Sequence, residues 1–254
     1  PGVKYDWQWS IFVQTAADGS GTWLHYLVGG LVWTLVTALA AWVLALSIGS
    51  VVGTLRTTPL VWIVRAGNLY VEIFRNVPLL VQMFLWFFVL PELLPERIGT
   101  AIKQMPPPWS SYLPAILCLG IYTSVRVAEQ VKAGIQSLPR GQQMAGTALG
   151  LSLPQTYRYV LLPMAFRIVM PPLTSEFLNI IKNSSVALTI GLLELTGRAR
   201  AMQEFSFKVF EAFSAATVIY LITNLVIVLL MRKLENKIRV PGFIGSASPI
   251  TPGH

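Results

Sequence analysis

The hydrophobic residues of this chain gather in long runs that charged residues seldom interrupt. The first run, 26–55, contains no charged residue at all. About 20 apolar residues are enough for a helix to cross a bilayer. Runs of this kind predict five transmembrane helices, at about 26–55, 67–90, 111–133, 165–193 and 212–231. The pattern therefore predicts an all-α integral membrane protein, with a single transmembrane domain over residues 1–254.

The second run is the least regular, because charged residues and a proline precede its uncharged part, 79–90. That part is too short to span a bilayer alone, so the helix is expected to start near Gly67. Glu72 and Arg75 then lie three residues apart on one helix face, where they can pair. We interpret them first as a structural ion pair at the mouth of the bundle. Contact with a transported substrate is the second interpretation.

The fourth run carries the most polar side chains within a predicted span. Its polar residues near the end are Glu176, Asn179, Lys182, Asn183 and Ser184. The first four recur at i, i+3, i+6 and i+7, so we expect them to share one polar helix face. Ionisable groups at membrane depth are costly and normally face a pore or a partner subunit. This segment is therefore the best candidate for a substrate path within a span, with Lys182 as the group that would attract an anion. A lysine near the end of a span can instead extend toward the lipid headgroups, so a structural role for Lys182 remains open.

The two ends of the chain differ from the spans. Residues 1–24 mix aromatic side chains with aspartates and glycines, a composition typical of the membrane–water interface. They contain no basic segment followed by an apolar core, so no signal peptide is expected there. Residues 241–254 are rich in Gly, Ser and Pro and are expected to form a flexible tail.

Composition supports the membrane class. Charged residues make up 12% of the chain, whereas soluble domains carry roughly a quarter. The formal net charge is +8, but the basic residues form no single cluster or tail, which argues against a nucleic-acid partner. Two histidines and one cysteine offer no metal-binding or disulfide pattern, and there is no phosphate-binding loop or Ser–His–Asp set. We therefore expect no catalytic residue, no metal site and no cofactor in this chain.

One polar segment between the apolar runs, 137–163, predicts structure of its own. Two Ser-Leu-Pro triplets, beginning at Ser137 and Ser152, each have the pattern of a helix start. Residues 140–149 between them suit a short helix rich in small side chains, which Gly150 would end. Small side chains let another surface approach the backbone closely. A loop that merely links two spans is the alternative interpretation.

The placement of basic residues predicts the orientation of the chain. If 137–163 is cytoplasmic, the cytoplasmic side of the protein holds eleven basic residues, some of them at the ends of the predicted spans, and the other side holds six. Cytoplasmic loops of membrane proteins carry an excess of Lys and Arg. The bias predicts an amino terminus outside and a carboxyl terminus in the cytoplasm.

The segment 137–163 resembles the cytoplasmic loop shared by permease subunits of bacterial ABC importers. The matching residues are Gly141-Gln142, Ala145, Ala148-Leu149-Gly150-Leu151 and Val160-Leu161-Leu162-Pro163. Met144 stands where the family has a glutamate, and Gly146 replaces an alanine. In that family the loop forms a coupling helix that docks on the ATPase subunit. The resemblance implies ATPase coupling by Arg140, Gly141, Gln142, Met144, Ala145, Gly150, Leu162 and Pro163.

Further strings are similar to the glutamate/aspartate permeases of the polar amino acid ABC importers. They include Glu72-x-Phe-Arg-Asn-Val-Pro-Leu, Pro171-Pro-x-Thr-Ser-Glu and Lys182-Asn-Ser. The resemblance implies a type I ABC importer permease fold in a bacterial cytoplasmic (inner) membrane and import of a polar, acidic amino acid. It also implies a homologous permease subunit or a second copy, two ATPase subunits that bind ATP and Mg, and a substrate-binding protein. The alternative function is an ion-gradient-driven carrier or channel subunit, in which Lys182 and Glu176 would form a gate.

Overall fold

The structure is a computed structural model that describes residues 5–238. Within this range every regular element is a helix, and one isolated bridge pairs Thr15 with Thr22. The long helices are α1 (Trp23–Leu55), α6 (Trp109–Gln136), α9 (Leu162–Asn183) and α11 (Val209–Ile238). The shorter ones are η1 (Trp9–Val13), α2 (Val61–Asn76), α3 (Leu79–Phe84), η2 (Leu85–Val89), α4 (Leu90–Leu93), α5 (Glu96–Lys103), α7 (Arg140–Ala148), α8 (Leu153–Thr156), η3 (Tyr157–Leu161), η4 (Ser184–Ile190) and α10 (Leu195–Ser206).

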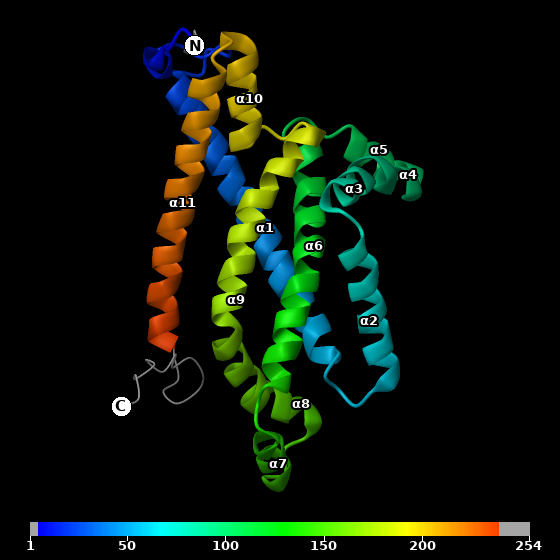
Figure 1. Ribbon diagram of the computed structural model, residues 1–254. Helices are drawn as coiled ribbons and strands as arrows, with labels where there is room; N and C mark the ends of the chain where they lie inside the picture. The colour runs from blue at the N-terminus through cyan, green and yellow to red at the C-terminus, as the bar shows by residue number, and fades with distance from the viewer. Residues whose placement is uncertain (1–4, 239–254) are drawn as a thin grey trace, which may run out of the picture.

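The long helices run lengthwise through the molecule, with α2 beside α6 (Figure 1). The start of α1 and the helix α10 lie at one end, and α7 forms the tip of the other. The all-α prediction is therefore confirmed for the described residues. The predicted tail, 241–254, lies outside them.

Three described helices, α1, α6 and α11, are long and apolar enough to cross a membrane. The pair formed by α2 and the helices at 79–93 would be a fourth, broken span. The predicted span 165–193 falls on α9 and η4, and α9 contains Arg167, Glu176 and Lys182, which lower its hydropathy. The count of five spans thus stays a prediction.

The predicted span 67–90 is broken, because the chain bends by 101° between α2 and the helices that follow. The residue before a proline avoids the helical conformation. Accordingly Val77, with ψ 124°, is extended and Pro78 leads into α3. The Gln82 side chain closes the bend, since its Nε2 donates to the carbonyl oxygens of Phe74 (2.9 Å) and Val77 (3.0 Å).

The end of the predicted loop is helical and continues into α9. Helices α8, η3 and α9 follow one another without a gap from 153 to 183. Pro163 lacks an N–H and crowds the carbonyl four residues earlier. The turn before it widens into the π-helix η3, in which the N–H of Leu162 donates to the carbonyl oxygen of Tyr157. The end of the segment 137–163 is therefore joined to the following span by unbroken helix, with a π-helical turn at η3.

Helices α1 and α6 pack through glycines. A Cβ at Gly49 would lie 2.5 Å from Val127 Cβ, and a Cβ at Gly53 would lie 2.6 Å from the carbonyl oxygen of Ala128. Small residues of this kind let two membrane helices approach closely. The C-terminal half of α1 therefore packs directly against the C-terminal half of α6.

The segment before α1 folds against the end of the bundle that carries α10. The Gln8 N–H donates to Glu211 Oε1 (2.7 Å), and Lys208 Nζ lies 3.0 Å from Asp6 Oδ2. Trp7 and Trp9 stack on one another and are half exposed. The interfacial role predicted for residues 1–24 fits this placement of aromatic rings at the end of the helices.

Candidate functional site

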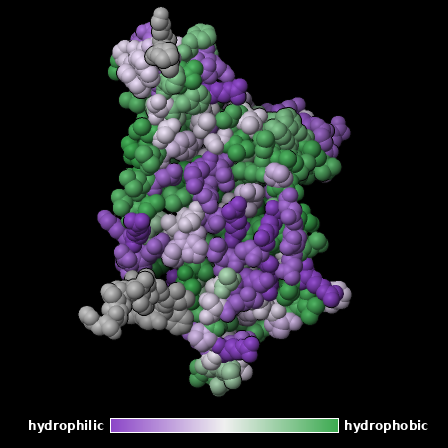
Figure 2. Space-filling model, in the orientation of Figure 1, coloured by the Kyte–Doolittle hydropathy of each residue, from purple (hydrophilic) through white to green (hydrophobic). Residues whose placement is uncertain are grey.

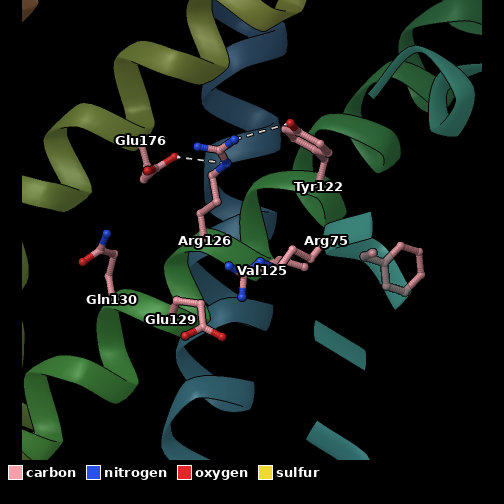
Figure 3. A pocket seen from close by; sticks show the side chains of 8 residues that line it. Arg75, Tyr122, Val125, Arg126, Glu129, Gln130 and Glu176 are labelled. Carbon is pink, nitrogen blue, oxygen red and sulfur yellow. Dashed lines mark hydrogen bonds and ion pairs between the residues drawn. The ribbon is translucent and has the colours of Figure 1, made fainter. Parts of the chain in front are cut away.

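A pocket of about 330 Å³ lies between α2, α6 and α9 (Figure 3). Four of its lining side chains carry formal charges. The lining residues are Phe74 and Arg75 of α2, Tyr122, Val125, Arg126, Glu129 and Gln130 of α6, and Glu176 of α9. The pocket is thus a charged cavity between hydrophobic helices.

Helix α6 supplies most of the pocket because its polar residues share one face. Tyr122, Arg126 and Glu129 follow the spacing of successive helical turns. The opposite face carries Val127 and Val131, which are fully buried in the core. The same helix therefore packs against α1 on one side and opens to the pocket on the other.

Arg126 and Glu176 face each other across the pocket (Figure 3). Arg126 Nε lies 3.9 Å from Glu176 Oε2, and Arg126 Nη2 lies 3.5 Å from the Tyr122 hydroxyl. The amide of Asn179 contacts Glu176 at 3.5 Å. These separations are at the long end of polar contacts, so Arg126 is held loosely and can exchange partners.

Glu129 is held more closely, by a buried arginine at the end of α1. Arg56 is 8% exposed, and its Nη1 lies 2.8 Å from Glu129 Oε1. Its Nε donates to Asn68 Oδ1 of α2 at 2.7 Å. Arg56 therefore ties α1, α2 and α6 together at the lower edge of the pocket.

The predicted pairing of Glu72 with Arg75 does not occur. Asn76, four residues after Glu72, donates to its carbonyl oxygen (2.7 Å) and lies 3.3 Å from its Oε2. Arg75 lines the pocket instead. Among residues 5–238, no carboxylate lies within ion-pair distance of Arg75.

The predicted polar face of α9 is divided. Glu176 lines the pocket with Asn179 against it, whereas Lys182 and Asn183 do not line it. A side chain six positions along a helix points about 120° away from the first. Lys182 is accordingly exposed on another side, and Ser184 is buried with its hydroxyl donating to the Ile181 carbonyl. The expectation that Lys182 and Glu176 share a face was therefore wrong.

Sequence reasoning did not select Arg126 or Glu129 as site residues. The signal was present, because both interrupt a run that is otherwise suited to a span. An ionisable residue inside a transmembrane segment is a functional candidate by default. The same rule that selected Glu176 selects these two.

The second candidate surface is α7, at the tip of the molecule (Figure 1). Met144 is 69% and Leu149 is 79% exposed. Gly146 faces inward, where a Cβ would lie 2.9 Å from Thr156 Cγ2. Arg140, Gly141 and Ala145 are also exposed, Gln142 is half-buried, and Leu162 and Pro163 lie outside α7 at the start of α9. The tip of the molecule thus exposes two large apolar side chains beside small residues and an arginine, on a helix that packs on Thr156 through Gly146.

The surface above this tip is polar in the middle and apolar at the sides. Figure 2 shows hydrophilic residues over the central helices and hydrophobic residues flanking them. On the flanks, α11 exposes Leu221 and Leu230. Such apolar flanks fit lipid, whereas the polar centre fits a water-filled path or a second subunit. In the described part of the chain, no three His, Cys, Asp or Glu side chains are grouped to hold a metal ion.

Comparison with known proteins gives close relatives. Residues 45–240 match the family described as binding-protein-dependent transport system inner membrane component. The glutamate/aspartate import permease protein GltJ of Escherichia coli K12 is 48% identical over 244 residues, covering 96% of this chain and 99% of that protein. The glutamine transport system permease protein GlnP of the same strain is 30% identical over 226 residues, covering 88% and 98%.

Solved structures share the helical arrangement. An amino acid ABC transporter crystallised with histidines superposes with a TM-score of 0.70 at 27% identity, over 85% of this chain and 95% of that one. The methionine ABC transporter MetNI, in an inward-facing conformation, superposes with a TM-score of 0.70 at 18% identity, over 85% and 98%. At this lower identity the likeness concerns the fold alone.

Proposed function

Because this chain belongs to the family of binding-protein-dependent transport system inner membrane components, we propose that it imports glutamate or aspartate through the pocket between α2, α6 and α9. The chain is the transmembrane subunit of an amino acid ABC importer in the inner membrane, and it is not itself the ATPase. An ATPase and a substrate-binding protein are its partners. This membership decides against the ion-gradient-driven carrier that the sequence left open.

The charge of the pocket supports an acidic substrate. Glu129 is already paired with Arg56 at 2.8 Å. The remaining charged lining groups are Arg75, Arg126 and Glu176, two cations and one anion. Glutamate and aspartate each carry two carboxylates and one ammonium, which is the complementary set.

The geometry of arginine suits this role. A guanidinium binds a carboxylate through two parallel hydrogen bonds, each stronger than a bond between neutral groups. Arg126 would receive the side-chain carboxylate, which glutamine lacks, Arg75 the α-carboxylate, and Glu176 the ammonium group. The long contact between Arg126 and Glu176, 3.9 Å, is weak enough for a substrate to replace.

The wider assembly follows from the surfaces of the chain. The polar centre in Figure 2 would be costly against lipid, so it is covered by a second permease subunit, either a homologue or another copy. We assign five spans, counting α9, with the amino terminus outside and the carboxyl terminus in the cytoplasm. The exposed tip of α7 docks on one of two ATPase subunits, which bind the ATP and Mg.

Replacing Arg126 tests the substrate site. In complex reconstituted with its ATPase and binding protein, Arg126→Gln should lower glutamate uptake at least tenfold, because a charge-assisted hydrogen bond is lost. Glutamine uptake, measured in parallel, should change much less. The matched control is Arg200→Gln, which removes an exposed arginine paired with Glu204 on α10. Equal loss of both amino acids, or no loss, would contradict the assignment of Arg126.

A further inference from the structure

Tyr157 joins the helix after α7 to the turn between α1 and α2. Its hydroxyl lies 3.0 Å from Thr57 Oγ1 and 3.0 Å from the Thr57 carbonyl oxygen. The Thr57 hydroxyl can give its own proton to the Thr54 carbonyl, 2.7 Å away. The single proton of the Tyr157 hydroxyl is then donated to Thr57. Tyr157 is 8% exposed, so this bond is largely shielded from water and is costly to lose.

The partner of Tyr157 is adjacent in sequence to Arg56, which borders the pocket. Arg56 binds Asn68 of α2 and Glu129 of α6 at 2.7 and 2.8 Å. Helix α2 can pass over the arginine because Gly67 lies there, where a Cβ would be 2.6 Å from Arg56 Cγ. A displacement of the α1–α2 turn therefore displaces a buried guanidinium that three helices share.

A second connection leads from Tyr157 to the opposite wall of the pocket. Tyr157 begins η3, which continues into α9 and reaches Glu176. At 1.5 Å per residue, this helix carries the connection over roughly 28 Å. The two routes from Tyr157 thus end on Glu129 and Glu176, which are carboxylates on different walls of one pocket.

We propose that Tyr157 is a positioning residue that makes the coupling helix and the α1–α2 turn move as one body. When α7 shifts on the ATPase, the Tyr157–Thr57 bond carries the shift to the Arg56–Glu129 pair as well as to α9. Without that bond, the π-helical turn η3 takes up the movement locally, and only one wall of the pocket responds. The inference rests on the proposed docking of α7 on the ATPase.

Removing the hydroxyl tests this role without creating a cavity. Tyr157→Phe keeps the buried ring, and Tyr159→Phe is the matched control, since Tyr159 is 62% exposed two residues away. The assay is substrate transported per ATP hydrolysed, in the complete complex in proteoliposomes. We expect about a fivefold lower ratio for Tyr157→Phe, the equivalent of one hydrogen bond, and no change for Tyr159→Phe. A purely structural role would lower the amount of folded complex and leave this ratio unchanged.

A second variant identifies the route. Arg56→Lys keeps the charge but removes the fork that joins Asn68 to Glu129. If Tyr157 acts through Arg56, the combined variant should lose no more than the more severe single variant. Losses that multiply would overturn the route through Arg56.

The docking of α7 is measured separately, as retention of the ATPase by the purified permease. A Tyr157→Phe complex that keeps its ATPase and its native transport ratio overturns the inference and leaves the docking proposal intact. If the docking proposal is wrong, variants of the α7 surface will instead retain the ATPase and couple ATP hydrolysis to transport as the native protein does.

Discussion

Gly150 ends helix α7, for which we propose docking on the ATPase, in a conformation that most other residues avoid. Its φ is +76°. Its N–H donates to the Thr147 carbonyl oxygen at 2.9 Å. The N–H of Leu151 donates to the Gly146 carbonyl oxygen at 3.0 Å, which completes a Schellman closure. A residue other than Gly, Asn or Asp raises the conformational free energy of the backbone by about 1–2 kcal/mol in this left-handed region. A Cβ would meet no atom of this chain within 4 Å, so the cost within the subunit is one of backbone conformation.

Comparing Gly150→Val with Gly150→Asn separates the effect of backbone conformation from the effect of side-chain bulk. Both add a side chain at the same point, but asparagine tolerates the left-handed region. We expect Gly150→Val to lower transport per ATP hydrolysed about 5- to 30-fold, which corresponds to 1–2 kcal/mol. Gly150→Asn should keep most of the native ratio. The subunit should insert normally in both cases, as measured by the amount of folded permease in the membrane. A native ratio in Gly150→Val would refute this use of α7.

Gly141→Ala then tests whether the ATPase approaches α7 closely. Gly141 is exposed, and a Cβ there would also meet no atom of this chain within 4 Å. Alanine favours the helix over glycine by up to about 1 kcal/mol, so the subunit is not weakened. A lower transport ratio in Gly141→Ala therefore reports an outside surface against the helix, and we expect one. Native coupling in both Gly141→Ala and Gly150→Val would refute the docking of α7.

The remaining predictions concern Met144 and Lys182. Met144→Glu restores the residue usual in the family at a position that is 69% exposed; we expect ATPase coupling within about twofold of native, because no partner in this chain requires the charge. A large gain in transport-coupled ATP hydrolysis would contradict this. Lys182→Met should change uptake of acidic and neutral amino acids equally or not at all, because Lys182 does not line the pocket. A loss confined to acidic amino acids would place Lys182 in the path.

Local sequence signals predicted those features whose causes are local. Hydrophobic runs marked α1, α6 and α11, and the Ser-Leu-Pro triplets with Gly150 marked the short helix α7. The bend at Val77-Pro78 also has a local cause, the proline. We nevertheless predicted one continuous helix there, because the uncharged part, 79–90, is too short to span a bilayer alone. The structure resolves this conflict by breaking the helix and closing the corner with Gln82.

Contacts between distant parts of the chain left no pattern in the sequence. Tyr157 and Thr57 are 100 residues apart, and Arg56 and Glu129 are 73 apart. Periodicity reports which residues share a face of one helix, and it carries no information about which helix will face that side. The links between α7 and the pocket could therefore be recognised only in the structure.

The position of Glu176 opposite Arg126 shows how packing decides such a partnership. Helices α6 and α9 run in opposite directions (Figure 1), and they meet where Gly134 leaves room for Val169; a Cβ at Gly134 would lie 2.4 Å from Val169 Cγ1. Arg126 lies eight residues before Gly134, and Glu176 lies seven residues after Val169. Equal steps of 1.5 Å per residue along antiparallel helices bring the two charges to nearly the same height, roughly 11 to 12 Å from the glycine contact. The contact at Gly134 fixes this register of the two helices. In this register Glu176, and not Lys182, lies beside Arg126.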